Sequence, residues 1–314
     1  MKVVASAPGK IIITGEHFVV HGSFAVAAAI NKRARVSVSE TDQKRSLIYS
    51  KGFQKSFLSS NDGRFHALKS VASKVFNEFG KPRTPVLINV DSEIPLGSGL
   101  GSSAAVSVAA AGALTRFLGK ELGKDKLLEI ASDGEKKVHG NPSGIDTETS
   151  LNGGVLLFNR NSGSKSIPLT GAITMIAVFS GIKRDTGKLV NKVALKRKES
   201  PYFFSSLVDS SSFTSLEVAD ALSNGDLPYL GSLMSASQCA LSWIGASTPK
   251  LESLIETALE NQDCFGAKLT GAGGGGSIIA LPKPERAEAL LERISKKYRD
   301  SFIVSIPQEG LKFE

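Results

Sequence analysis

Hydrophobic and polar residues alternate along the chain with two different periods, and each period predicts a different kind of element. Within residues 34–40, Val36 and Val38 alternate with Ser37 and Ser39, which predicts a half-buried strand. Residues 65–79 repeat apolar side chains every three or four positions, which predicts a helix that Gly80 ends. Short apolar runs with neither period, such as residues 173–179, indicate strands buried on both faces.

The same criteria predict elements over the rest of the chain. Strands are expected at 2–7 and 11–15 around a Pro8-Gly9 turn, and at 47–50, 86–90, 154–158, 267–270, 277–281 and 302–306. Helices are expected at 102–118, 126–138, 187–198, 213–224, 226–243, 249–260 and 285–298. Strands and helices do not alternate regularly, so the pattern predicts a two-domain α+β fold and not a doubly wound sheet.

A polar segment at residues 159–166 has no apolar side chain to anchor it, and we expect the domain boundary there. The predicted domains are residues 1–165 and 166–314. A length of 314 residues suits two domains, and 41% hydrophobic with 22% charged residues is typical of a folded chain.

Cysteine content and apolar run lengths indicate the compartment. Only Cys239 and Cys264 are present, which excludes a disulfide framework and a cysteine-based metal cluster. The apolar run near the N-terminus is too short for a signal peptide, and residues 104–114 are too few for a membrane span. We therefore expect a cytoplasmic protein in a reducing compartment, with no membrane partner.

The net charge of +8 has three interpretations: solubility, nucleic-acid binding, or a small anionic substrate. Aromatic residues make up only 7% of the chain and form no stacking motif, which disfavours nucleic acid. Arg184, Lys188, Lys192 and Lys196 recur every four residues and would form one stripe on a helix. A solvated face is the simpler interpretation for Lys192 and Lys196.

A glycine-rich segment at residues 95–105 carries the strongest chemical signal. Three glycines alternate before Ser102 and Ser103 open a helix rich in Ala and Val. Free N–H groups and the positive end of the helix dipole at such a start bind phosphate. A tight turn with an N-cap serine is the alternative, but the small side chains of the helix favour a nucleotide loop. The spacing fits neither a Walker A loop nor a Rossmann fingerprint.

Three further segments carry candidate chemistry. Residues 8–22 place a lysine, a glutamate and the pair His17/His21 around an apolar strand; no metal motif accompanies that pair, so a metal site there is disfavoured. Glu135 and Asp146 flank an Asn-Pro-Ser-Gly turn, in which Ser143 is expected to cap a helix that carries Asp146. Two interpretations stay open. Taken alone, Asp146 is explained by compensation of the helix dipole, as is common for an acid in the first turn of a helix. Alternatively, the turn directs the carboxylates of Glu135 and Asp146 to one metal–phosphate centre.

Residues 268–276 contain five glycines in the six positions from Gly271 to Gly276. Such a loop is too flexible for a plain hairpin, so its backbone is expected to approach a ligand or the first glycine loop closely.

Together these segments resemble the GHMP small-molecule kinases. Pro8-Gly9-Lys10, the Gly-Leu-Gly-Ser-Ser run and the Gly-Ala-Gly-Gly-Gly-Gly run occur in the family's order and span most of the chain. Residues 15–22 and 139–146 resemble the signature of the mevalonate kinase branch, in its compact archaeal-like form. The resemblance implies a ribosomal-protein-S5-like N-terminal domain and a ferredoxin-like C-terminal domain. It also implies ATP as co-substrate, Mg²⁺ as cofactor and a homodimer.

The resemblance also implies a role for each matching residue. Asp146 would be the catalytic base and Lys10 its partner, while Ser103 and Glu135 would bind Mg²⁺. The ATP phosphates would lie on Gly97, Ser98, Gly99, Leu100, Gly101, Ser102 and Ser103. The substrate pocket would be lined by Glu16, His17, Ser143 and Thr186. Apart from the resemblance, Arg184 lies two residues before Thr186 at the start of the basic segment, where we expect it to meet a substrate carboxylate.

The implied reaction is phosphorylation of the C5 hydroxyl of (R)-mevalonate on the route to isoprenoids. The nearest alternative is the same fold acting on phosphomevalonate, a sugar or homoserine. A non-catalytic nucleotide- or nucleic-acid-binding protein is the other alternative, and Lys10, Glu135 and Asp146 together disfavour it.

Overall fold

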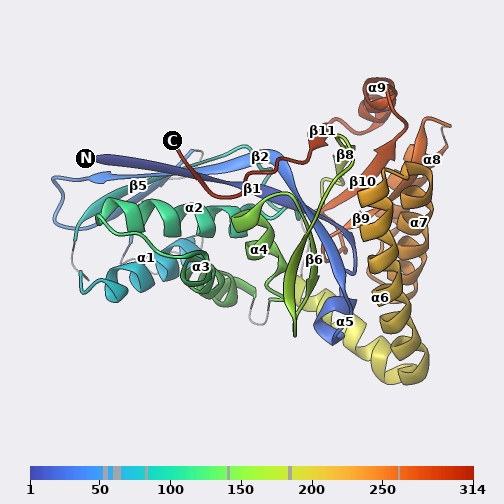
Figure 1. The fold of residues 1–314 in the computed structure, drawn as a ribbon, viewed down its shortest axis with the longest axis horizontal. Coiled ribbons are helices and arrows are strands. Elements are labelled where there is room, and N and C mark those ends of the chain that lie inside the picture. The colour runs from blue at the N-terminus through green and yellow to red at the C-terminus, as the bar shows by residue number, and fades with distance from the viewer. Residues whose placement is uncertain (52–55, 59–64, 82–83, 140–141, 183–185, 261) are drawn as a thin grey trace.

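Two β-sheets and the helices packed on them make up the protein, as seen in a computed structural model (Figure 1). The structure describes residues 1–314 apart from 52–55, 59–64, 82–83, 140–141, 183–185 and 261. None of the described helices is long and apolar enough to cross a membrane.

The first sheet is built on two long neighbouring strands. Its path runs β12-β1-β2-β5-β3-β4, and β6 pairs with the far end of β2 and carries β7 on its other edge. All of its described pairings are antiparallel except β3 with β5. The strands are β1 (Lys2–Thr14), β2 (Ala25–Glu40), β3 (Leu47–Ser50), β4 (Ser56–Phe57), β5 (Val86–Ser92), β6 (Val155–Asn159), β7 (Gly163–Ile167) and β12 (Lys312–Phe313).

Four helices lie along one face of this sheet (Figure 1). They are α1 (His66–Glu78), α2 (Ser102–Phe117), α3 (Lys124–His139) and α4 (Ile145–Asn152). Helix α2 is buried on most of its circumference, because its small Ala, Ser and Gly side chains let α1, α3 and the sheet approach it closely. A short 3-10 helix, η1 (Phe18–His21), follows β1.

The second sheet has the order β11-β8-β10-β9 and is antiparallel throughout. Its strands are β8 (Thr174–Phe179), β9 (Cys264–Thr270), β10 (Ser277–Pro282) and β11 (Ser301–Ser305). Successive residues of β8 enter different apolar clusters: Met175 and Ala177 pack in one, Ile176 and Val178 in the other. Both faces of the sheet are therefore buried, which explains the continuous apolar run in the sequence.

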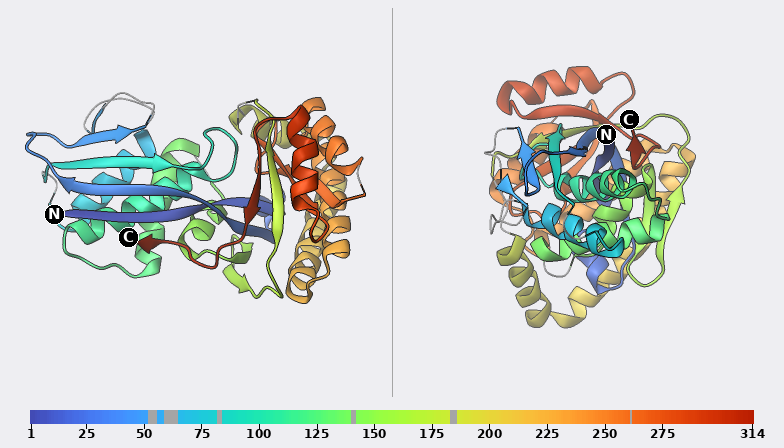
Figure 2. Two further views of the ribbon diagram at one scale, coloured as in Figure 1. Left: turned by 90° about the horizontal axis from the view of Figure 1, so that it is seen from above. Right: turned by 90° about the vertical axis from the view of Figure 1, so that its left-hand side faces the viewer.

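The remaining helices are α5 (Thr186–Glu199), α6 (Pro201–Asn224), α7 (Leu227–Trp243), α8 (Pro249–Leu259) and α9 (Ala287–Lys297). Of these, α7, α8 and α9 pack against the second sheet, and α6 packs against α7 and the first sheet. Helix α5 packs against α6 at the lower edge of the view in Figure 1. The last residues of the chain then return to the first sheet, so the C-terminus lies on the same half of the molecule as the N-terminus (Figure 2).

Two local expectations differ from the structure. Pro8-Gly9 is not a turn: β1 continues through it, and a register shift against β2 between these two residues absorbs the irregularity. Helix α6 begins at Pro201 and not near residue 213, since proline is well suited to the first turn of a helix.

The polar segment 159–166 forms the turn of the β6–β7 hairpin and most of the exposed strand β7, which explains why it lacks an apolar anchor. The predicted boundary between residues 165 and 166 falls inside β7, and the second sheet starts with β8.

Candidate active site

The candidate catalytic residues meet in one cavity of about 190 Å³ where the end of β1, helices α3 and α4 and the glycine loop after β9 converge. Its lining includes Lys10, Glu16, His17, Glu135, Ser143, Asp146 and Ala272. Segments more than 250 positions apart in sequence therefore contribute to one site, as the three family-like motifs led us to expect.

Lys10 and Asp146 form an ion pair in this cavity, with Lys10 Nζ 3.2 Å from Asp146 Oδ1. Lys10 lies on β1 and is only 1% exposed, whereas a third of the Asp146 side chain is open to solvent. The lysine is therefore fixed by its surroundings, and the carboxylate is the partner that an incoming molecule can reach.

Asp146 owes its position to the start of α4. The structure places Gly144 at the N-cap, with a φ of 95° and no side-chain cap. Our expectation that Ser143 caps this helix is therefore wrong, because a glycine in the left-handed region turns the chain instead. Ser143 still lines the cavity beside Asp146.

The glycine loop before α2 packs directly onto Lys10. The backbone N–H of Lys10 donates to the Leu100 carbonyl at 2.9 Å. Gly101 precedes the helix with a φ of 79°, and a Cβ added there would lie 2.8 Å from Cγ of Lys10. The loop thus brings the N-terminus of α2 beside the Lys10–Asp146 pair. The first N–H groups of a helix have no acceptor within the helix, and such groups can bind phosphate.

The hydroxyl of Ser103 and the carboxylate of Glu135 also come together. Ser103 Oγ donates to Glu135 Oε1 at 2.5 Å, and Glu135 is almost fully buried on α3. A hydroxyl and a carboxylate side by side are oxygen donors of the kind that Mg²⁺ prefers, so these residues fit the expected metal. No cluster of three or more His, Cys, Asp or Glu residues with metal-binding geometry occurs within the described ranges.

Glu16 and His17 attach the first sheet to the C-terminal glycine loop. His17 has a φ of 61°, and its Nε2 donates to the Ala272 carbonyl at 2.6 Å. Glu16 is buried against Lys268 of β9, with which it forms an ion pair. His21 instead faces Phe204 and Arg197, so the two histidines do not converge on one metal position.

Sequence reasoning missed Lys268. A lysine inside an otherwise apolar strand is a signal that a buried partner exists, but its partner Glu16 lies 252 positions away. Of the other expected substrate residues, Thr186 begins α5, and Arg184 lies outside the described residues.

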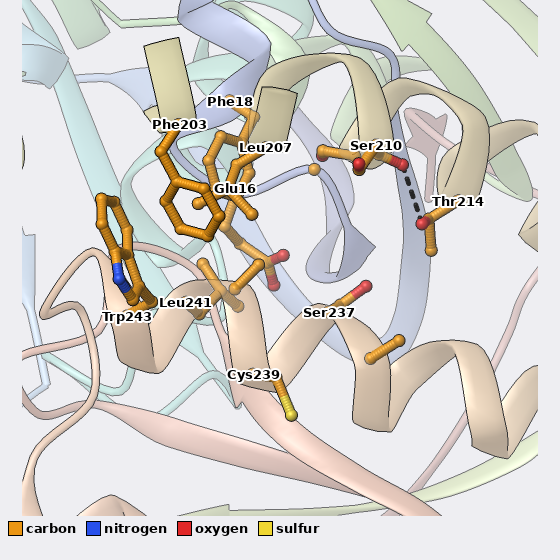
Figure 3. A pocket seen from close by; sticks show the side chains of 14 residues that line it. Glu16, Phe18, Phe203, Leu207, Ser210, Thr214, Ser237, Cys239, Leu241 and Trp243 are labelled. Carbon is orange, nitrogen blue, oxygen red and sulfur yellow. Dashed lines mark hydrogen bonds between the residues drawn. The ribbon is translucent and has the colours of Figure 1, made fainter. Parts of the chain in front are cut away.

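A second cavity, of about 350 Å³, lies between α6 and α7 and shares Glu16 with the first (Figure 3). Its walls are mainly apolar, including Phe18, Phe203, Leu241 and Trp243. The Glu16 carboxylate points toward this space, so Glu16 forms part of the wall between the two cavities (Figure 3).

Comparison with known proteins identifies the family. Residues 66–154 match the family described as "GHMP kinases N terminal domain", and residues 218–300 match "GHMP kinases C terminal". A protein named mevalonate kinase from Archaeoglobus fulgidus is 38% identical over 99% of this chain and 100% of its own length. The chain belongs to the GHMP kinase family. Another relative of the same name, from Aeropyrum pernix, is 35% identical over 99% of this chain and 98% of its own.

A solved structure agrees with this membership. L. major mevalonate kinase in complex with R-mevalonate superposes with a TM-score of 0.82 at 26% identity, over 96% of this chain and 94% of that one. The predicted two-domain GHMP kinase fold is therefore confirmed, and so is the prediction that the protein is a phosphotransferase.

Proposed function

We propose that this enzyme transfers the γ-phosphoryl group of ATP to the C5 hydroxyl of (R)-mevalonate, giving 5-phosphomevalonate and ADP for isoprenoid synthesis. The observation that carries the proposal is the Lys10–Asp146 pair, 3.2 Å apart, beside the N-terminus of α2 in one cavity. The full-length relatives named mevalonate kinase support mevalonate as the acceptor.

In the proposed reaction the Asp146 carboxylate takes the proton of the C5 hydroxyl as its oxygen attacks the γ-phosphorus of ATP. The bond from the γ-phosphorus to the bridging oxygen breaks, and ADP leaves. General-base assistance of this kind contributes roughly 10²–10⁴-fold in rate. The Lys10 cation compensates negative charge on the attacking oxygen and the transferred group, which is the main requirement of phosphoryl transfer.

ATP would lie with its phosphates over residues 97–103, where the N–H groups at the start of α2 are free of helix partners. Ser103 and Glu135 would hold Mg²⁺, which supplies further neutralisation of phosphate charge when bound. Glu16, His17, Ser143, Arg184 and Thr186 remain the proposed contacts to mevalonate.

The test is an ADP-release assay on mevalonate, phosphomevalonate, galactose and homoserine with the same enzyme preparation. We expect kcat/KM for mevalonate to exceed that for each other alcohol by about 100-fold or more, since a mismatched polar group leaves site groups unpaired. Omission of Mg²⁺ should abolish ADP release. A higher kcat/KM for another alcohol would reject mevalonate as the substrate while leaving the kinase class intact.

A further inference from the structure

The strongest feature outside the Lys10–Asp146 pair is a second buried ion pair, between Lys268 and Glu16. Their exposed fractions are 0% and 2%. Lys268 Nζ donates to Glu16 Oε1 and to the Leu269 carbonyl, the latter at 2.7 Å. Burying two charges is costly unless they are paired and hydrogen-bonded, so such a pair often serves a purpose other than stability.

This pair lies where the two sheets meet. Lys268 and Thr270 are two positions apart on β9, an edge strand of the second sheet, and both reach across to the first sheet. Thr270 Oγ1 accepts from the N–H of Ile12 at 2.8 Å and donates to its carbonyl at 3.1 Å. Because residues two apart in a strand point the same way, one face of β9 holds the end of β1.

Lys268 contacts only one of the two carboxylate oxygens of Glu16 within the described residues. The other oxygen, Oε2, is buried and has no hydrogen-bond partner among the described residues, while Glu16 lines the candidate active site. On the side toward α6 and α7 the wall is apolar apart from Ser and Thr hydroxyls and the Cys239 thiol, and no cation lies there among the lining residues (Figure 3).

The charged and titratable groups around Glu16 are few. Lys268 contacts it from β9, and Lys10 on β1 is close enough for its charge to act on Glu16. His17 is next to it in the chain, and Asp146 and Glu135 line the same cavity from α4 and α3. Lys268 is thus the cation in direct contact with the Glu16 carboxylate.

We propose that Lys268 is a positioning residue for the substrate: its contact with Oε1 holds the Glu16 carboxylate in the wall between the two cavities, so that Oε2 is left to accept a hydrogen bond from a substrate hydroxyl. This inference rests on the proposed function. The pKa of Glu16 is raised, because burial outweighs the charge and the hydrogen bond of Lys268, which both lower it. Without that lysine, burial and the remaining neighbours would leave a carboxyl group that titrates at higher pH.

Replacing Lys268→Met tests the inference. At about pH 7 we expect the mevalonate KM to rise tenfold or more, because loss of Lys268 frees the Glu16 carboxylate and raises its pKa further, so that less of the acceptor is ionised. Between about pH 7 and about pH 9 the KM should fall, because more of Glu16 is ionised at the higher pH. The ATP KM should stay within about twofold, since ATP binds at α2. The wild-type mevalonate KM should stay nearly flat over this range.

Two controls separate positioning from simple packing. The double variant Glu16→Gln/Lys268→Met has no group to titrate there, so its mevalonate KM should be high at every pH. Thr270→Val loosens the same contact between the sheets without removing a charge, so its Tm should fall while its KM stays flat with pH. A Lys268→Met enzyme whose KM is unchanged, or raised equally at every pH, would overturn the proposal.

If Lys268→Met gives no folded protein, Lys268→Gln keeps a hydrogen-bond donor without the charge and must show the same pH-dependent KM. A flat profile there would also overturn the proposal. The substrate panel on the wild-type enzyme comes first. If another alcohol is the substrate, mevalonate fails as the acceptor, and the role of Lys268 is then measured by the KM of that alcohol.

Discussion

Asp146 forms an ion pair with Lys10, and a third of its side chain is open to solvent. Asp146→Asn keeps the size of the side chain and removes the base. We expect kcat to fall by about 10²–10⁴-fold or more, while ATP affinity stays within about twofold, because residue 146 lies outside the α2 loop. ADP release measures kcat, and calorimetric titration with ATP measures affinity.

Asp125→Asn is the matched control for this variant. Asp125 is also an acid in the first turn of a helix, α3, but it is exposed and lies outside the cavity. It should lose at most a few tenths of a kcal/mol of stability and no activity. Near-normal turnover by Asp146→Asn would remove Asp146 from the role of base.

At the residue scale, the sequence indicated which side chains lie together where a local motif surrounds them, whereas their roles stay predictions. Such motifs surround Lys10, Ser103, Glu135 and Asp146. The structure pairs Lys10 with Asp146 and Ser103 with Glu135. The role of Lys268 could not be predicted, because it depends on how the second sheet packs against the end of β1. The Ser143 cap was mispredicted because Gly144 offers the chain a turn that needs no side chain.

At the scale of elements, helix α2 depends on how closely its N-terminus approaches β1. Gly101→Ala places a methyl group 2.8 Å from Lys10 Cγ and forces a side chain into a φ of 79°. We expect a loss of about 1–2 kcal/mol from the backbone strain and a further loss of kcat as Lys10 is displaced. Thermal denaturation and ADP release give the two quantities separately.

Gly119→Ala at the other end of the same helix is the control, because it introduces the backbone strain without a clash against Lys10. Gly119 has a φ of 69°, and a Cβ there would meet nothing within 4 Å. This variant should therefore lose similar stability while keeping its kcat. Equal kcat losses in both variants would mean that the approach of the loop to Lys10 is unimportant for catalysis.

At the scale of the whole molecule, the sequence periods predicted nearly every helix and the two-domain α+β class, but not how the two halves connect. The last residues have no clear period, yet β12 pairs with β1, and Arg33 donates to the carbonyls of Glu309 and Gly310. Those contacts join segments over 270 positions apart, and no local pattern encodes such a distance.

The returning C-terminal segment also reaches the helix that carries Asp146. The N–H of Leu311 donates to the carbonyl of Leu151, in the last turn of α4, at 3.1 Å. A Cβ at Gly310 would lie 2.0 Å from that same carbonyl oxygen, so only glycine allows this approach. The C-terminal segment therefore supports the last turn of α4, whereas Asp146 lies in its first turn.

Gly310→Ala should push the segment away from α4. We expect a loss of about 1–3 kcal/mol of stability from overpacking, and a several-fold lower kcat if the shift reaches Asp146, with thermal denaturation and saturating ADP release as the measurements. Gly123→Ala is the control, because Gly123 is exposed and a Cβ there meets nothing within 4 Å. Wild-type Tm and kcat in Gly310→Ala would show that α4 holds its position without the C-terminal segment, whereas a lower Tm with normal kcat would restrict that segment to a stabilising role.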